Sequence, residues 1–317
     1  MIELSRRALI GAGASLAALP ATARLAAAQT QHQRIAIWPG QAPGGERVTV
    51  TEREIPRSST GPAADTAFVN VTRPTLTTVR PAKSNGAALL LIPGGGYRRV
   101  AVGLGTFSIA EWFALRGYTA HILVYRLPAD GWAAGPDAPL QDAQRALRLV
   151  RANAKDYDPD RIGILGFSAG GHLAARLAAR QDIQSYRAVD ATDRLPLAPK
   201  VAGLLYPVVS MTGSHVHGGS RDEMFGKGVA AERAAPFAAD ARIAPGTPPT
   251  FIAHAIDDRV VPPENGIAMM SALRNADVPT ELHLFERGGH GFGLEAAGAP
   301  SPWPELFLGW AKTHGLT

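Results

Sequence analysis

Short apolar runs alternate with stretches of helical periodicity through most of the chain. Six apolar runs have the length of buried strands: 87–92, 118–125, 162–165, 201–209, 249–256 and 280–286. Between and after them, apolar positions recur at helical spacing in 107–115, 139–157, 169–180, 263–276 and 304–314. Such alternation predicts an α/β fold with a mostly parallel, doubly wound sheet and right-handed crossovers.

The chain before this alternation is β-rich. Segments 34–38, 47–52 and 68–79 are rich in alternating or β-branched residues, and Gly and Pro interrupt them repeatedly. They predict antiparallel edge strands that lead into the sheet.

One long irregular interval, 210–248, breaks the regular alternation. It is rich in Gly, Ala and Arg, and it interrupts an otherwise regular α/β pattern. A segment of this length is typical of a lid or a substrate-contacting insertion rather than of a structureless loop.

The first 28 residues have the pattern of an export signal of the twin-arginine type. Arg6 and Arg7 precede a short apolar stretch, 8–19, and small residues near 21–28 offer cleavage sites. We therefore expect a periplasmic or secreted protein whose catalytic domain spans residues 29–317.

Composition narrows the function classes. Apolar residues make up 46% and charged residues 19% of 317 residues, as in an ordinary globular enzyme. The formal net charge of the chain is +5, and the predicted signal contributes three arginines and one glutamate to it. The positive charge that remains is too small to indicate nucleic acid binding. No later apolar run reaches 18 residues, so no integral membrane segment is expected. Cysteine is absent, which excludes thiol nucleophiles and thiolate metal sites.

The sequence Gly166-Phe-Ser-Ala-Gly170 lies between a predicted strand and a predicted helix. This G-x-S-x-G pattern in a strand–turn–helix context is that of a nucleophile elbow. Glycines two residues to either side of Ser168 let the strand and helix backbones approach closely. A Gly-rich connection with an incidental serine is the alternative, and the rest of the chain has to decide between the two.

Two further strand ends carry an acid and a histidine. Asp257 and Asp258 follow the strand 249–256, and the Asp-x-x-Val-Pro spacing favours Asp258, with Asp257 as the alternative. His290 lies between glycines after the strand 280–286, on a loop that can reach over a serine. The order Ser168, Asp258, His290 is the order of an α/β-hydrolase triad.

The three glycines 94–96 directly follow another strand. Unhindered N–H groups of Gly95 and Gly96, together with that of Ala169, can stabilise a developing oxyanion. A phosphate-binding loop is the alternative, but neither a following Lys-Ser/Thr nor a G-x-G-x-x-G pattern is present.

From about residue 86 onward the chain resembles α/β hydrolases of the bacterial carbohydrate-esterase branch, similar to acetylxylan and feruloyl esterases. The motifs that carry this resemblance are Pro93–Tyr97, Pro139–Ala143, Gly166–His172, Gly219–Gly226 and the loops of Asp258 and His290. The resemblance implies that Ser168 is the nucleophile, Asp258 the acid and His290 the base, with no cofactor.

Several other residues are weaker candidates. Tyr97 and Trp132 are candidate apolar walls of a substrate site, or simply packed side chains. A metal at the pair His215 and His217 is disfavoured because no third ligand stands at suitable spacing. His172 and His254 are expected to be structural. Arg98 and Arg99 either contact an acidic sugar or are solvated.

The favoured function is therefore a serine ester hydrolase that acts on short acyl esters of plant-polysaccharide fragments. The substrate is a small-molecule or oligosaccharide ester, and the oligomeric state is not predicted. A prolyl-oligopeptidase-like peptidase or amidase and a non-catalytic ligand-binding protein of the same fold are the alternatives. The sequence shows neither an N-terminal propeller nor an evident acidic pair for a peptide amino terminus, which argues against the peptidase.

Overall fold

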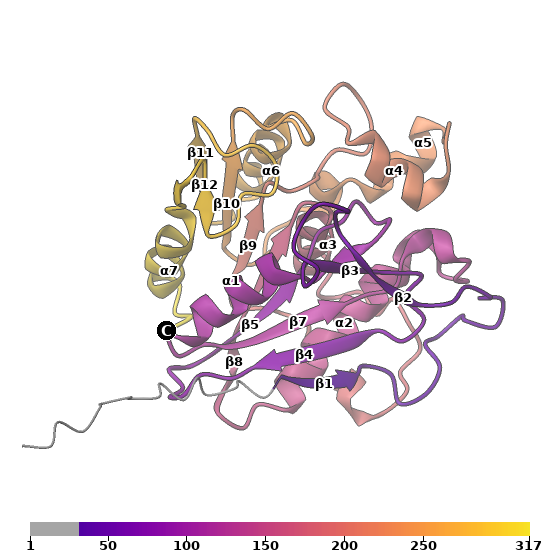
Figure 1. Cartoon of the computed structure of the whole chain (residues 1–317), viewed down its shortest axis with the longest axis horizontal. Coiled ribbons are helices and arrows are strands. Elements are labelled where there is room, and N and C mark those ends of the chain that lie inside the picture. Colours follow the sequence, from indigo (N-terminus) through magenta and orange to yellow (C-terminus); the bar gives the residue numbers. More distant parts are fainter. Residues whose placement is uncertain (1–31) are drawn as a thin grey trace, which may run out of the picture. The chain divides into compact units, whose positions relative to one another are not determined.

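The computed structural model describes residues 32–317. Their centre is an eight-stranded sheet (Figure 1). In spatial order its strands are β1 (Gln33–Ala36), β4 (Thr75–Val79), β7 (Thr119–Val124), β5 (Gly86–Ile92), β8 (Tyr157–Phe167), β9 (Ala202–Leu205), β10 (Thr250–Ala255) and β11 (Thr280–Phe285). Only β4 runs antiparallel to its neighbours, β1 and β7, so the predicted mostly parallel sheet is confirmed.

Helices cover both faces of this sheet (Figure 1). They are α1 (Leu104–Ala114), α2 (Ala138–Ala152), α3 (Ala169–Ala178), α6 (Glu264–Asn275) and α7 (Trp303–Thr313). On one face, Phe113 of α1 packs against Trp303 and Phe307 of α7. On the other, α2 and α3 pack against each other and against β8. The sheet core is built from the apolar runs of the sequence, and β5 is fully buried after its first residue.

The β-rich start of the chain differs in detail from its prediction. Segment 47–52 is not a strand; β2 (Arg53–Pro56) follows it and pairs with β3 (Thr66–Val69), which pairs with β6 (Val100–Ala101) in a separate small sheet. The run 68–79 divides between β3 and β4, because Asn70 has a φ of 55° and Pro74 precedes β4. The chain therefore turns where the residue pattern predicted one extended run.

Two other element boundaries also moved. The predicted strand 201–209 ends at Leu205, because Tyr206 has a φ of 38° and Pro207 has no N–H to donate to a neighbouring strand. Helix α1 begins three residues earlier than predicted. The interval 210–248 contains α4 (Gly218–Phe225), α5 (Ala231–Ala234) and two short 3₁₀ turns, and α4 contacts the turn η1 (Pro128–Asp130). A further β-ribbon, β12 (Glu295–Ala296) with β13 (Ala299–Pro300), precedes α7.

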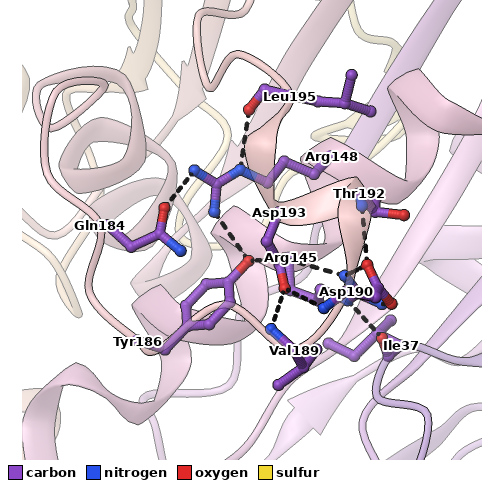
Figure 2. Close-up of polar contacts among 10 residues, drawn as sticks. All are labelled: Ile37, Arg145, Arg148, Gln184, Tyr186, Val189, Asp190, Thr192, Asp193 and Leu195. Atoms are coloured by element: carbon purple, nitrogen blue, oxygen red, sulfur yellow. Dashed lines mark hydrogen bonds and ion pairs between the residues drawn. The ribbon is translucent and has the colours of Figure 1, made fainter.

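Two arginines of α2 hold the segment that follows α3 (Figure 2). Arg145 forms ion pairs with Asp190 at 2.5 Å and with Asp193 at 3.0 Å. Arg148 donates to the hydroxyl of Tyr186 at 2.9 Å. The Arg145 hydrogen bond lowers the pKa of Asp190 to about 2. The connection between α3 and β9 is thus fixed to the helix layer by charge-assisted hydrogen bonds.

Candidate active site

Ser168 occupies a strained turn between β8 and α3. Its φ and ψ are 55° and −121°, a conformation that L-residues rarely adopt. A Cβ at Gly166 would lie 2.4 Å from the carbonyl oxygen of Gly170, and a Cβ at Gly170 would lie 2.1 Å from that of Ile92. Both flanking positions therefore require glycine, as expected for a nucleophile elbow.

His290 lies within hydrogen-bond distance of Ser168. The Nε2 atom of His290 is 2.9 Å from the Oγ atom of Ser168, and its Nδ1 atom is 2.7 Å from Oδ2 of Asp258. Gly289 and Gly291 have φ values of 60° and 83°, so the loop after β11 needs glycine on both sides of the histidine. The arrangement lets His290 accept the serine proton while its other nitrogen donates to a carboxylate.

Asp258 is buried at the end of β10 and is held by several donors. Its Oδ1 atom accepts from the backbone N–H groups of Val260 and Val261, each at 2.9 Å. Burial raises the pKa of this carboxyl, but hydrogen bonds from His254 and His290 outweigh burial and hold the pKa well below its usual range. Asp257, the alternative acid, instead accepts from the backbone N–H of Gly289 at 2.7 Å.

The glycine loop after β5 lies directly against Ser168. A Cβ at Gly94 would be 2.9 Å from the Cβ of Ser168, and a Cβ at Gly95, whose φ is 133°, would be 2.1 Å from the carbonyl oxygen of Arg99. Within residues 32–317, the N–H groups of Gly95, Gly96 and Ala169 donate to no protein acceptor. Three free N–H groups beside one nucleophile are what an oxyanion site requires.

A hollow of about 300 Å³ opens over these groups. Ser168, His290 and the glycines 94–96 line it, together with Tyr206 and His217. The ring of Tyr206 meets that of His290 edge-on, with centroids 5.1 Å apart. The residues that can perform acyl transfer therefore share one concave site that a substrate can enter.

Tyr97 does not line this hollow, although the sequence made it a candidate substrate wall. It is fully buried, and its hydroxyl donates to Nδ1 of His172 at 2.7 Å. The Nε2 atom of His172 in turn donates to the carbonyl of Phe237, also at 2.7 Å, and burial lowers the pKa of His172 to about 3. Tyr97 thus connects the glycine loop to α3 and to the segment 210–248, and His172 is structural, as expected.

Trp132 is likewise absent from the wall of the Ser168 hollow. It lines a separate hollow of about 430 Å³ together with Trp38 and Arg73. The guanidinium of Arg126 lies over its ring, 4.7 Å from the centroid. Sequence periodicity could not separate these packed aromatic residues from a substrate-contacting pair.

The sequence interpretation did not name Tyr206 or Arg57 as residues of the hollow, and it gave His217 as a disfavoured metal ligand or a loop histidine of the lid. His217 is the N-cap of α4, where its Nδ1 atom accepts from the backbone N–H of Ser220 at 3.1 Å. Its proton is therefore on Nε2. Over residues 32–317 no group of three or more His, Cys, Asp or Glu side chains could hold a metal ion.

No helix in the described part of the chain is long and apolar enough to cross a membrane.

Comparisons with known proteins relate the chain to esterases. The family model described as BD-FAE matches residues 78–273, more than half of the chain. A xylanase, endo-1,4-beta-xylanase B of Butyrivibrio fibrisolvens, is 33% identical over 70% of this chain and 34% of its own length. An acetylxylan esterase of Xylanibacter ruminicola is 31% identical over 68% of this chain and 42% of its own length. The matched region thus spans less than half of either curated relative.

Solved structures share the fold over most of the chain. The acetyl ester-xyloside bifunctional hydrolase of Caldicellulosiruptor lactoaceticus has a TM-score of 0.70 and 30% identity, and the match covers 90% of this chain and 97% of that one. An esterase of Thermogutta terrifontis has a TM-score of 0.63 over 80% of this chain and 93% of that one; at 24% identity it supports the fold alone. The strand order and the turn at Ser168 are those of an α/β hydrolase, in agreement with the family match. The chain belongs to the BD-FAE family of α/β hydrolases.

Proposed function

We propose that this protein is a serine carboxylic-ester hydrolase that removes short acyl groups from plant-polysaccharide fragments. The observation that supports this proposal most directly is the chain of contacts from Ser168 through His290 to Asp258. Ser168 and His290 line an open hollow, beside three backbone N–H groups that have no protein acceptor among residues 32–317. This combination is what nucleophilic acyl transfer needs.

Catalysis proceeds in two half-reactions. Ser168 attacks the ester carbonyl while Nε2 of His290 takes the serine proton, and the N–H groups of Gly95, Gly96 and Ala169 stabilise the oxyanion. The intermediate collapses to an acyl-enzyme, and His290 returns the proton to the departing alcohol. Water, activated by the same histidine, then adds to the acyl-enzyme and releases the carboxylic acid with Ser168 restored.

The substrate class is proposed from the relatives. One is named an acetylxylan esterase and another an acetyl ester-xyloside hydrolase, so an acetyl group on a xylan fragment is the first candidate, and a feruloyl group is the second. An exported enzyme would meet such fragments. The predicted twin-arginine signal, residues 1–28, lies outside the described residues, and export to the periplasm or the medium is part of this proposal.

A serine variant tests the mechanism. Ser168→Ala should lower kcat for p-nitrophenyl acetate by about 10⁴-fold or more, and a fluorophosphonate probe should label the wild type but not the variant. Acetylated xylan fragments, feruloylated sugars and aminoacyl amides assayed side by side separate an esterase from a peptidase. Native-rate hydrolysis by Ser168→Ala would overturn the mechanism, and faster turnover of the amides than of the esters would overturn the substrate class.

A further inference from the structure

Three arginines are among the residues that line the hollow containing Ser168. They are Arg57, Arg98 and Arg99, and no aspartate or glutamate of the described chain lines the same hollow. Guanidinium groups stay protonated at any physiological pH. The approach to the proposed nucleophile is therefore positively charged.

The three arginines come together from distant parts of the sequence. Arg57 directly follows β2, whereas Arg98 and Arg99 follow the glycine loop, and Nη1 of Arg99 donates to the carbonyl oxygen of Arg57 at 3.3 Å. Burial, and then the charges of Arg57 and Arg98, lower the pKa of Arg99, while Asp65 opposes this shift. Arg57 and Arg98 are thus both close enough to Arg99 for their charges to act on it.

Only part of this charge is neutralised within the protein. Asp65 forms an ion pair with Arg57 at 3.3 Å, and both side chains are partly exposed. Among residues 32–317, no carboxylate lies within ion-pair distance of Arg98 or Arg99. An ordinary protein surface carries acidic and basic side chains side by side, whereas the charged side chains that line this hollow are arginines, and no carboxylate of the described residues lines it. A cleft lined by one sign of charge focuses its field on whatever binds there.

We propose that the substrate of this site is an ester whose alcohol part carries a carboxylate, such as an acylated oligosaccharide that bears a uronic acid. The inference rests on the proposed esterase function. A carboxylate matches the paired N–H groups of a guanidinium. An acetyl group has no place for a second charge, so the carboxylate belongs to the sugar that leaves, not to the acyl group.

A matched pair of substrates tests the inference. Acetylated, glucuronic-acid-substituted xylo-oligosaccharides are compared with the same oligosaccharides after methyl esterification of the uronic acid, which removes the charge and adds one methyl group. We expect kcat/KM to be about five- to tenfold higher for the charged substrate at low salt, and this ratio to shrink at about 0.5 M NaCl because exposed charges are screened.

Arginine variants test whether the preference for the charged substrate comes from the arginines of this hollow. Arg98→Gln and Arg99→Gln should each bring the charged-to-neutral ratio closer to one. Arg274→Gln is the matched control: Arg274 is an exposed arginine at the end of α6 and does not line the hollow, so its variant should keep the wild-type ratio.

The outcomes separate this inference from the proposed function. Hydrolysis of both substrates at equal rates by the wild type would overturn the inference and leave the esterase proposal standing. An equal fall of the ratio in Arg274→Gln and in Arg98→Gln would also overturn it, because the preference would then follow net charge rather than this hollow. Hydrolysis of neither substrate, nor of p-nitrophenyl acetate, would contradict the proposed function itself.

Discussion

The Nε2 atom of His254 lies 3.4 Å from Oδ2 of Asp258, the same oxygen that accepts from His290 at 2.7 Å. Nε2 of His254 also donates to the carbonyl oxygen of Val261 at 3.0 Å, so its proton is on that nitrogen. His254 is fully buried, and its Nδ1 atom has no hydrogen-bond partner within the described residues. This histidine therefore positions the acid of the proposed triad.

Replacement of His254 should lower kcat and leave KM nearly unchanged. In His254→Leu, Asp258 loses a contact that lowers its pKa, so this pKa should rise toward its usual range. Asp258 stays a carboxylate at neutral pH in either protein, but without His254 it is held less firmly against His290, so kcat should drop about 10-fold or more with little change in KM. The measurement is kcat and KM at neutral pH for both proteins.

His254→Gln provides the matched variant, because glutamine keeps an N–H donor. It should recover part of the lost kcat. A wild-type kcat in His254→Leu, with a folded protein by thermal unfolding, would rule out the positioning role.

The glycine loop should tolerate no side chain at Gly95. In Gly95→Ala the new Cβ would meet the carbonyl oxygen of Arg99, so the loop must move and carry its N–H groups away from the oxyanion. Loss of one such donor typically costs about 10²- to 10³-fold in kcat. Gly246→Ala is the control, with a φ of 93° and no atom within 4 Å of the new Cβ. It should lose stability but keep kcat, and equal losses of kcat in the two variants would contradict this role of the loop.

His217 should contribute to substrate binding through its Nε2 proton. Since Nδ1 accepts from the backbone N–H of Ser220, the ring proton is on Nε2, and His217 is one of the residues that line the hollow. Burial and the charge of His290 lower the pKa of His217, which favours the neutral ring. In His217→Phe we expect KM for acetylated xylo-oligosaccharides to rise about three- to tenfold, the effect of one hydrogen bond, with a smaller effect on kcat. The exposed His215, in a His215→Gln control, should leave KM unchanged.

The sequence predicted the parts of the site that depend on local patterns. The elbow at Ser168 was recognisable because the turn requires glycine at fixed spacing, and Asp258 and His290 because each follows an apolar run. In a parallel sheet the carboxyl ends of strands meet at one edge, so chain order was enough to bring these residues together.

Residues joined only by tertiary packing were not predictable in this way. Arg57 reaches the hollow because β2 leaves the main sheet, and the residue pattern there suggested one continuous set of edge strands. Tyr97 follows the glycine loop in sequence, yet its φ of 61° takes the ring into the core rather than into the hollow. Side-chain direction at such positions depends on a backbone conformation that composition does not reveal.

Asp130 should make the folded protein less stable as the pH rises. Its Oδ1 atom accepts from Asn70 at 3.1 Å, but its buried Oδ2 atom has no partner within the described residues. Burial and the charge of Glu223 on α4 raise the pKa of Asp130 to about 6, although hydrogen bonds from Asn70 and Val71 oppose the shift. The folded state therefore holds this proton more tightly than the unfolded state, whose carboxyl has the ordinary value of 3.8.

The free energy of unfolding should accordingly decrease between about pH 4 and pH 6 and stay lower above that range. Asp130→Asn removes the titration, so relative to wild type the variant should gain about 2 kcal/mol at pH 8 compared with pH 4. Urea unfolding of both proteins at the two pH values measures this difference. Glu223→Gln, which removes only the neighbouring charge, should give a smaller gain of the same sign. The same pH dependence in wild type and Asp130→Asn would show that Asp130 does not hold its proton in the folded state.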